Sequence, residues 1–434
     1  MKETSKVAQK IAQNYKAYVS DETEDTVIVE IETENIQLAQ EMLAATGKRT
    51  IFKKGLRDEI DEKISRYKDE TSEKEEGYIG RLYERIIKNA YRKDASDIHI
   101  EPFESQCFIR FRIDGRLIKV EKISKKECSS LVSYIKLRAG MDITERKIPR
   151  DGRMDESCED GFIDIRVSSI PTVNGEKLVL RMLNRNSFVR NINEIGFSRE
   201  AVSMIREITS QSKGLFLVCG PTGSGKTTTV YSIIKELMDD EKNITTIENP
   251  VEYRIDGINQ IQINRKKGLG FNECLKSVLR QDPDIIMVGE IRDIETAETA
   301  VRAAITGHLV ISTLHTEDAV SAIIRLEDMG IKPYMISASL RGIIAQKLVR
   351  KLNNSDTENL FKNKKYRGRT AVYEIMAIDK NIKERIRLSL NREKIIKRAG
   401  NKFIGFEKTC FDAISSGTTD MEECIIAGCI KQDK

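Results

Sequence analysis

The segment GPTGSGKT at residues 220–227 has the residue types and spacing that bind phosphate. It fits the pattern GxxxxGK[ST], follows an apolar run at 215–219, and opens a segment with helical periodicity, TTTVYSIIKELM. Small residues let backbone N–H groups curl around phosphates, so we expect Lys226 to reach the terminal phosphates and the Thr227 hydroxyl to hold Mg²⁺. A glycine-rich turn with a surface lysine is the simpler alternative, which the strand–loop–helix context disfavours. The residues expected to bind nucleotide are Gly220, Pro221, Thr222, Gly223, Ser224, Gly225, Lys226, Thr227 and Thr228.

Two other apolar segments end in glutamate. PDIIMVGEIRD, at 283–293, would place Glu290 at the end of a buried strand beside the phosphate loop, where it could hold Mg²⁺, partly through water. TTIENPVEY, at 245–253, places Glu248 at the end of another strand, and Glu252 follows it. Hydrolysis needs a base that orients water toward the γ-phosphate, so we expect Glu248 in that role and Glu252 in support. A capping or turn carboxylate is the alternative for each.

Two of the three histidines of the chain lie within one short segment, TGHLVISTLHT at 306–316. His308 and His315 stand at opposite ends of an apolar strand, about 23 Å apart if the strand is fully extended. Both therefore cannot reach the same phosphate unless the chain turns. We expect His315, at the carboxyl end of the strand, to lie closer to the γ-phosphate and His308 to anchor the strand or a subunit contact. A satisfied core or capping histidine is the alternative for each.

The composition indicates a water-soluble, multidomain protein. A chain of 434 residues is too long for one ordinary core, and its Lys and Arg total of 73 exceeds its Asp and Glu total of 68 by only 5. This weak positive bias disfavours nucleic acid as a partner. The eight scattered cysteines include no CxxC pair, which indicates reduced thiols in the cytoplasm. We expect neither a signal peptide nor a transmembrane segment.

Hydrophobic periodicity divides the chain into three predicted domains. Residues 1–70 form a small α+β module with a strand at 26–32 and a helix at 35–47, and residues 71–188 form a second α+β domain. Between 57 and 76, 14 of 20 residues are charged, which we interpret as a solvated helix face passing into a linker. Residues 189–434 alternate short apolar strands with helices, which predicts a parallel sheet with ligand-binding loops at the carboxyl ends of its strands.

Longer motifs occur in the order and with the spacing of a known family. The third domain contains GPTGSGKTTT, ITTIENPVEY, LRQDPDIIMVGEIRDIETA and TGHLVISTLHT, and the second contains ASDIHIEP, RFRIDG, PRDGR, DIRVSSIPT and GEKLVLRML. Together they resemble the secretion ATPase superfamily, the motors of type II secretion and type IV pilus assembly. The resemblance covers nearly the full chain, and GEIRD with ETA, like GEK with LR, is more similar to the assembly or secretion branch than to the retraction branch.

This resemblance implies an α/β fold with a RecA-like P-loop ATPase domain, a preceding PAS-like α+β domain and a small N-terminal α+β module. It implies a homo-hexamer that binds ATP and Mg²⁺ between its second and third domains, with Glu248 as base, Glu290 beside the metal, and both histidines of the strand in the "His box". Arg153, Arg166 and Arg181 match arginines of the family's second domain, from which charge-stabilising fingers come. A surface salt bridge is the alternative for each arginine.

The family also implies where the protein works. Its partners would be an inner-membrane platform protein and the associated assembly proteins of the cytoplasmic face. The chain would then be cytoplasmic and peripheral at the inner face of the cell membrane.

Three departures from the family pattern alter these expectations. Asn249 stands where the family usually has aspartate after the glutamate, which reduces the charge near the proposed base but does not remove it. Many relatives carry two CxxC pairs after a segment like AQKLVRKL, whereas no cysteine lies between Leu352 and Tyr373, so we expect no zinc site. The chain starts too late to hold the longer module with which some relatives bind a cyclic dinucleotide, and we do not predict that ligand.

Three functions stay open at this point. A motor would couple ATP hydrolysis to the assembly of a type IV pilus, a competence pilus or a secretion pseudopilus, and the sequence does not choose among these machines. A nucleotide-gated scaffold with little turnover is the first alternative, to which Asn249 gives some room. A related DNA-transfer ATPase is the second, which the near-neutral charge disfavours.

Overall fold

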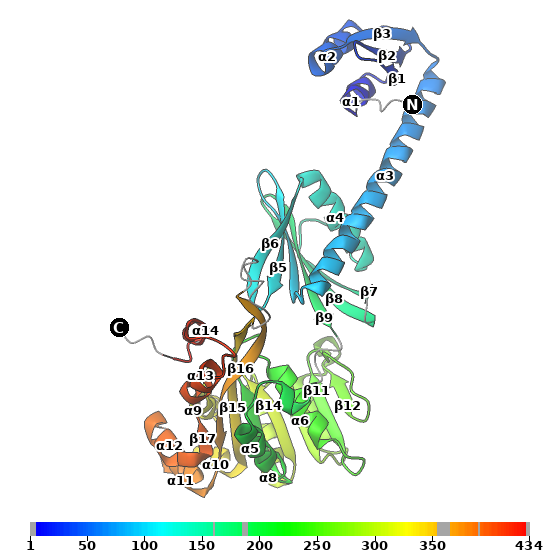
Figure 1. The fold of residues 1–434 in the computed structure, drawn as a ribbon. Coiled ribbons are helices and arrows are strands. Elements are labelled where there is room, and N and C mark those ends of the chain that lie inside the picture. Colours follow the sequence, from blue (N-terminus) through cyan, green and yellow to red (C-terminus); the bar gives the residue numbers. More distant parts are fainter. Residues whose placement is uncertain (1–5, 159–160, 185–189, 354–364, 389–390, 431–434) are drawn as a thin grey trace.

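The computed structural model describes residues 6–158, 161–184, 190–353, 365–388 and 391–430, with residues 6, 65–76, 161 and 184 described by their backbone alone. The described strands form three sheets of three, six and eight strands. The sheets follow one another along an elongated molecule, with the long helix α3 (Arg57–Arg92) between the first and the second (Figure 1). Each sheet and the helices that cover it form one unit, numbered in chain order. The predicted α/β class with two preceding α+β units is confirmed.

The first unit packs two helices against its sheet. These elements are α1 (Lys6–Asn14), β1 (Tyr18–Glu22), β2 (Thr26–Ile31), α2 (Ile36–Thr46) and β3 (Arg49–Lys54). β2 lies between an antiparallel neighbour, β1, and a parallel one, β3. Helix α2 begins where the Asn35 side chain accepts the Leu38 N–H and ends at Gly47, whose φ of 71° suits glycine. The strand predicted at 26–32 and the helix predicted at 35–47 are both present.

Helix α3 corrects one expectation. The charged stretch after residue 57 does not pass into a linker, because its backbone continues as one helix of 36 residues, about 54 Å long. Neither proline nor glycine interrupts residues 57–76, and opposite charges four residues apart support the first turns, as Arg57 and Asp61 do at 3.0 Å. The domain boundary predicted near residue 70 therefore falls inside a helix, and the boundaries themselves stay predictions.

The second unit is an antiparallel sheet with the strand order β6-β5-β4-β9-β8-β7. The C-terminal part of α3 and helix α4 (Lys125–Arg138) cover one of its faces, and alternate residues of the strands form a core with them. Ser124 and Glu127 form a reciprocal cap at the start of α4. The strands are β4 (Asp97–Pro102), β5 (Cys107–Ile113), β6 (Arg116–Ile123), β7 (Arg150–Cys158), β8 (Gly161–Thr172) and β9 (Gly175–Asn184).

The third unit contains the eight-stranded sheet, ordered β12-β11-β13-β14-β10-β15-β16-β17. The first six strands in this order are parallel, whereas β16 and β17 are antiparallel to their neighbours. The strands are β10 (Gly214–Cys219), β11 (Ile244–Glu248), β12 (Asn259–Gln262), β13 (Ile285–Val288), β14 (Leu309–Leu314), β15 (Leu340–Leu352), β16 (Tyr366–Ala377) and β17 (Phe403–Ile404). Every residue of β10, β11, β13 and β14 is buried, which confirms the parallel strands predicted at these four segments.

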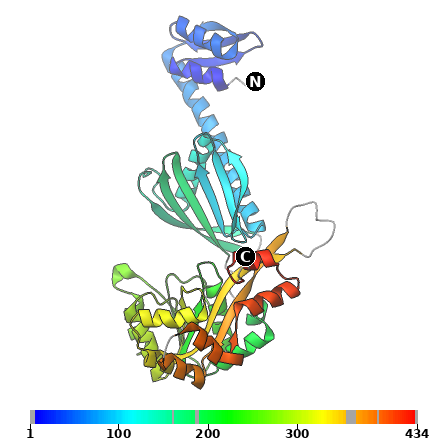
Figure 2. The same cartoon turned by 90° about the vertical axis from the view of Figure 1, so that its left-hand side faces the viewer.

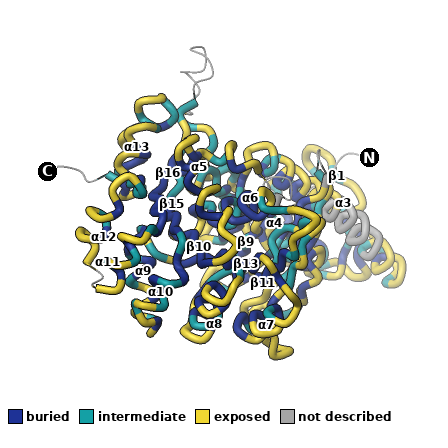
Figure 3. Tube along the Cα trace, turned by 90° about the horizontal axis from the view of Figure 1, so that it is seen from below, coloured by how far each residue is buried: buried dark blue, intermediate teal, exposed yellow. Residues whose placement is uncertain are grey.

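Helices cover both faces of this sheet, so its strands are dark blue between largely exposed outer surfaces (Figure 3). Leu215 and Leu217 of β10 belong to the core on one face, and Phe216 and Val218 to the core on the other, with α5 and α6. The helices are α5 (Arg199–Thr209), α6 (Lys226–Leu237), α7 (Phe271–Val278), α8 (Ile294–Thr306), α9 (Ala319–Asp328), α10 (Pro333–Ser339), α11 (Lys380–Leu388), α12 (Arg392–Ala399), α13 (Phe406–Ser415) and α14 (Met421–Ile426). Within the described ranges, no helix has the length and apolar character needed to cross a bilayer.

The second and third units meet through polar contacts. Strands β15 and β16 extend out of the third unit toward the second (Figure 2). There Asp114, in the turn between β5 and β6, accepts the Gly368 N–H at 3.0 Å and lies 3.7 Å from Arg369. Arg116 lies 3.5 Å from Glu423 of α14.

A buried ion pair stabilises the second unit. Lys136 of α4 is fully buried and donates to Glu176 at 2.8 Å and to the Glu145 carbonyl at 2.7 Å. We predict that Lys136→Met lowers the stability of this unit by about 3 kcal/mol, because it leaves the largely buried Glu176 carboxylate without its cationic partner. Thermal unfolding combined with hydrogen exchange of the second unit measures the loss. The double variant Lys136→Met, Glu176→Leu should recover part of the lost stability. Wild-type stability of the single variant Lys136→Met would show that the ion pair does not stabilise this unit.

Candidate active site at the phosphate loop

The phosphate loop follows β10 and curls into the start of α6. Gly220, Gly223 and Gly225 have φ values of 145°, 79° and 87°, in the region that favours glycine. A side chain at Gly220 would also collide with the backbone, because its Cβ would lie 2.3 Å from the Gln346 carbonyl oxygen. Glycine is therefore required at the first position by both conformation and space. With the loop curled in this way, the backbone N–H groups at the start of α6 can bind an anion.

Lys226 lies folded back on the loop that carries it. Its Nζ donates to the carbonyl oxygens of Gly220 at 2.8 Å and Pro221 at 2.9 Å. Burial lowers the pKa of Lys226, and its neighbours include Glu290. The Ser224 hydroxyl is one of the few buried polar side-chain groups in the described part of the chain that have no hydrogen-bond partner. A buried cation held by neutral carbonyls and a hydroxyl free to donate are the groups that fit the phosphates of a nucleotide.

Glu290 and His315 lie beside Lys226. Glu290 follows β13 and pairs with Arg292 at 2.7 Å, and His315 Nε2 lies 3.7 Å from the same carboxylate. About half of the His315 side chain is exposed, and its pKa is lowered by partial burial and by the positive charge of Lys226, against the opposing effect of Glu290. Thr313 of β14 donates to the carbonyl of residue 289 at 2.6 Å, which holds the two strand ends together.

Glu248 is the last residue of β11, the strand that pairs with β13, and it is buried. The residue is 3% exposed, and its carboxylate accepts hydrogen bonds from the Tyr231 hydroxyl, from Thr246 at 2.6 Å and from Gln260 at 3.2 Å. Burial raises the pKa of Tyr231, so the phenol donates and the carboxylate accepts. Gly289 packs against it, since a Cβ there would lie 3.5 Å from the Glu248 Cα. A water could reach Glu248 only after this cluster opens.

The three candidate arginines occupy one row across three neighbouring strands. Arg153 of β7 is opposite Arg166 of β8, which is opposite Arg181 of β9. Each is engaged by a carboxylate: Arg153 donates twice to Asp164, at 2.8 and 2.6 Å, Arg181 donates to Asp97 at 3.1 Å, and Arg166 donates to Glu252 at 2.9 Å. The Arg166–Glu252 contact joins the second unit to the third.

His308 lies at the other end of β14 from His315. Its Nδ1 is 3.1 Å from the Ala303 carbonyl at the end of α8, and its backbone carbonyl accepts the Gly214 N–H at 3.0 Å. These contacts tie the start of β14 to α8 and β10, away from the phosphate loop.

Gln346 is a residue of this site that the sequence did not single out. It lies on β15, is 1% exposed, donates from Nε2 to the Ser224 carbonyl at 2.6 Å and accepts from Thr229 at 2.8 Å. It thereby joins the phosphate loop, α6 and β15. Its only sequence signal is position, because it is a polar residue that directly follows the buried apolar run IIA at 343–345.

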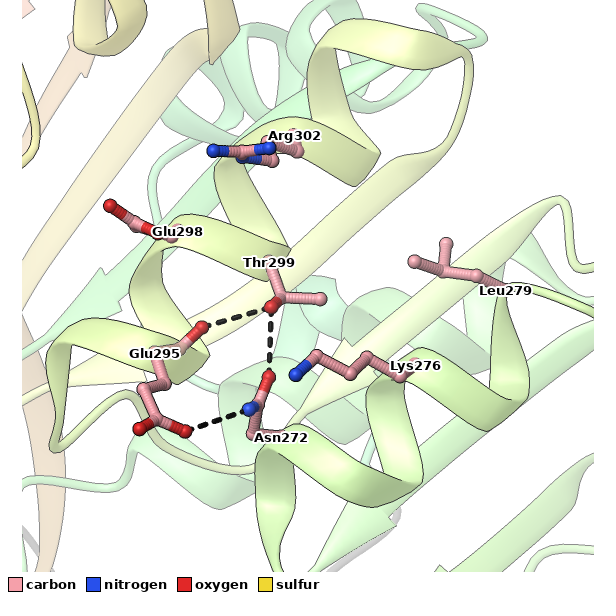
Figure 4. A pocket seen from close by; sticks show the side chains of 7 residues that line it. All are labelled: Asn272, Lys276, Leu279, Glu295, Glu298, Thr299 and Arg302. Atoms are coloured by element: carbon pink, nitrogen blue, oxygen red, sulfur yellow. Dashed lines mark hydrogen bonds between the residues drawn. The ribbon is translucent and has the colours of Figure 1, made fainter.

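A cavity of about 360 Å³ lies between α7 and α8 but is not a second site of this kind (Figure 4). Asn272 donates to Glu295 at 2.9 Å and accepts from Thr299 at 2.8 Å. The polar side chains at the centre of the cavity therefore already hydrogen-bond to one another. The remaining lining residues are Lys276, Leu279, Glu298 and Arg302.

The segment in which relatives carry the zinc cysteines falls largely at 354–364, outside the described residues. Elsewhere in the described ranges no cluster of metal-binding side chains occurs.

Comparison with known proteins gives a consistent result. The family described as Type II/IV secretion system protein matches residues 72–426. The chain is 38% identical over 390 residues to the type II secretion system ATPase E of Vibrio cholerae, covering 83% of this chain and 78% of the relative. It is 40% identical over 388 residues to the type IV pilus assembly ATPase PilB of Thermus thermophilus, covering 81% of this chain but only 43% of the relative.

Solved structures agree on the fold. The pilus retraction motor PilT with bound ADP is similar at a TM-score of 0.57 and 27% identity, covering 79% of this chain and 95% of that one. The ATPase DotB of Legionella pneumophila is similar at a TM-score of 0.65 and 23% identity, covering 80% and 95%. The second likeness concerns the fold alone.

The lowered pKa of His315 generates a pH prediction. The folded protein favours the neutral ring, so the stabilisation from neutral His315 is present above about pH 6.5 and is lost as the pH falls through the lower folded pKa. With only three histidines in the chain, NMR should resolve the titration of each. We predict that His315 titrates below its usual value of about 6.5 and that Lys226→Met raises its pKa. Lys242→Met, which changes an exposed lysine before β11, is the control; equal His315 titrations in all three proteins would contradict the electrostatic contact.

Gln346 generates a second prediction. Gln346→Leu removes both hydrogen bonds and leaves the Ser224 carbonyl and the Thr229 hydroxyl unsatisfied, at a cost of about 1–3 kcal/mol. If the loop loses its binding conformation, the affinity for a fluorescent ATP analogue should fall about tenfold or more. Thr229→Val is the matched control, because it removes only one of the two bonds and should weaken binding less. Wild-type affinity in Gln346→Leu would show that the loop does not depend on this side chain.

Proposed function

The chain belongs to the Type II/IV secretion system protein family, and from this we propose that it is a hexameric ATPase that drives assembly of a type IV pilus or a type II secretion pseudopilus. ATP binds at the phosphate loop, and its hydrolysis moves the third unit relative to the second. An inner-membrane platform protein and its cytoplasmic-face assembly proteins receive this motion. The protein accordingly acts in the cytoplasm, at the inner face of the membrane.

One observation carries the proposal. In the sheet order β11-β13-β14-β10, adjacent parallel strands end respectively in Glu248, Glu290, His315 and the loop with Lys226. A base, a metal-supporting carboxylate, an imidazole and a phosphate-binding cation therefore line one edge of the sheet. These are the groups that phosphoryl transfer to water requires.

Each group has a distinct part in the reaction. Lys226 exchanges its two carbonyl partners for phosphate oxygens, and the loop N–H groups and Ser224 bind the same anion. Thr227 and Glu290 are the residues that would hold Mg²⁺, which when bound neutralises developing charge on the phosphates. Glu248 orients the attacking water once its buried cluster opens. His315, in contact with Glu290, detects the loss of the γ-phosphate.

Arginines of the second unit complete the proposed mechanism. Arg166 donates to Glu252, and a γ-phosphate would compete with that carboxylate for the guanidinium. Exchange of one anion for the other changes the contact between the two units. Arg153 and Arg181, in the same cross-strand row, are the further candidates for stabilising phosphate charge, with ATP bound near a subunit boundary of the hexamer.

A nucleotide-gated scaffold is the second candidate, favoured by the burial of Glu248 and by Asn249 beside it. It keeps the same nucleotide site but has no steady turnover. DNA transfer has no comparable support, because the net charge is only +5.

Glu248→Gln distinguishes a motor from a scaffold. The amide keeps the shape of the carboxylate but cannot act as a base, so kcat should fall about 100-fold or more while ATP binding persists. Steady-state phosphate release and equilibrium binding of a fluorescent ATP analogue measure the two effects. Glu241→Gln, the same change in the exposed loop before β11, is the matched control. A wild-type protein that binds ATP without turnover would favour the scaffold, and full turnover in Glu248→Gln would exclude this residue as the base.

A further inference from the structure

Two cysteines of the second unit lie in direct contact within its core. Cys107 is the first residue of β5, and Cys128 lies in the first turns of α4. Their sulfurs are 2.7 Å apart, and both residues are buried, with exposed fractions of 0% and 4%. A disulfide bond is about 2.05 Å long, so a small side-chain movement would suffice to bond them.

A surface cavity is lined by one cysteine of this pair and not by the other. The cavity has a volume of about 190 Å³ and is lined by Cys128 and Ser129 of α4, by Lys125 and Arg146, and by the turn between β8 and β9. Cys107 is not among its lining residues, and its sulfur contacts that of Cys128. Since liquid water occupies about 30 Å³ per molecule, the cavity admits an oxidant as small as hydrogen peroxide and is small for a glutathione-sized disulfide.

Two cationic residues line the cavity that Cys128 borders. Lys125 and Arg146 line it, and its one carboxylate, Glu176, is already paired with Lys136. The hydrogen bond shared with Cys107 lowers the pKa of Cys128 and raises the pKa of Cys107. A low-pKa thiol beside a surface cavity, in contact with a second thiol, is an arrangement that can react selectively with a small oxidant.

We propose that Cys107 and Cys128 form a peroxide-reactive dithiol, with Cys128 as the attacking and Cys107 as the resolving residue. The Cys128 thiolate attacks one oxygen of hydrogen peroxide, the O–O bond breaks, and the departing hydroxide takes up a proton to leave as water. The Cys107 sulfur then attacks the Cys128 sulfenic acid: the S–S bond forms, the S–O bond breaks, and the Cys107 proton leaves with hydroxide as a second water. Two thiols are oxidised and one peroxide is reduced to two waters.

The resulting disulfide would fix the start of α4 to β5. β5 runs from Cys107 to Ile113, next to Asp114, which contacts Gly368 of the third unit. The disulfide would therefore lie at one end of β5, and the other end of this strand leads to the contact between the two units. Cys219 is a contrasting case, because it is fully buried beneath the phosphate loop and burial raises its pKa to about 12.

Peptide mapping of the intact chain tests the proposal. After a brief treatment with hydrogen peroxide and alkylation, mass spectrometry should find Cys107 joined to Cys128, with a loss of two hydrogen atoms and of two alkylatable thiols from this pair. Cys158, which is partly exposed, serves as the internal control for general oxidation. Full alkylation of both residues under conditions that oxidise Cys158 would overturn the proposal.

Two variants test the assigned roles. In Cys107→Ser the sulfenic acid has no resolving thiol, so dimedone should label Cys128; in Cys128→Ser no label and no disulfide should form at Cys107. Labelling of Cys107 in Cys128→Ser, or none of Cys128 in Cys107→Ser, would contradict this order of attack. If either variant fails to fold, mapping of the unaltered protein still decides whether the disulfide forms.

Discussion

Parallel pairing of four buried strands determines where the candidate catalytic groups lie. Because β11, β13, β14 and β10 run in the same direction and in register, their carboxyl ends meet at one edge of the sheet. Residues separated by 89 positions in the chain, such as Lys226 and His315, become neighbours through this constraint. The burial of every residue in these strands stabilises the register, since a slip by one residue would exchange the two cores on either face.

This dependence explains which parts of the site the sequence predicts. The buried strands are predictable because short apolar runs such as GLFLVCG end in glycine, glutamate or histidine, and the phosphate loop is predictable because its backbone conformation requires glycines. Gln346 is not predictable in this way. It lies 120 residues after Lys226, where α6 begins, and it reaches the phosphate loop solely because β15 pairs with β10 in the folded chain.

Other differences between expectation and structure have similar causes. The continuity of α3 depends on the absence of a helix-breaking residue between 57 and 76 more than on the charge pattern that suggests a linker. The pairing of Arg166 with Glu252, which lie 86 positions apart, requires the second unit to pack on the third, and neither residue carries a local sign of its partner. Charges whose partners are distant in sequence are therefore the part of the site that residue spacing cannot assign.

The joint between the second and third units is polar, and this has a consequence for motion. Among the described residues, the apolar core of the second unit spans residues 79–182, and the two cores of the third begin at residues 192 and 215, so none of these clusters crosses the joint. The contacts made across it by Asp114, Arg116 and Arg166 are ionic or hydrogen-bonded. Exposed ion pairs contribute little each and can exchange partners, whereas moving an apolar interface would expose its whole area to water. A unit held by such contacts can be repositioned by a competing anion at modest cost, which is what a nucleotide-driven motion of the third unit requires.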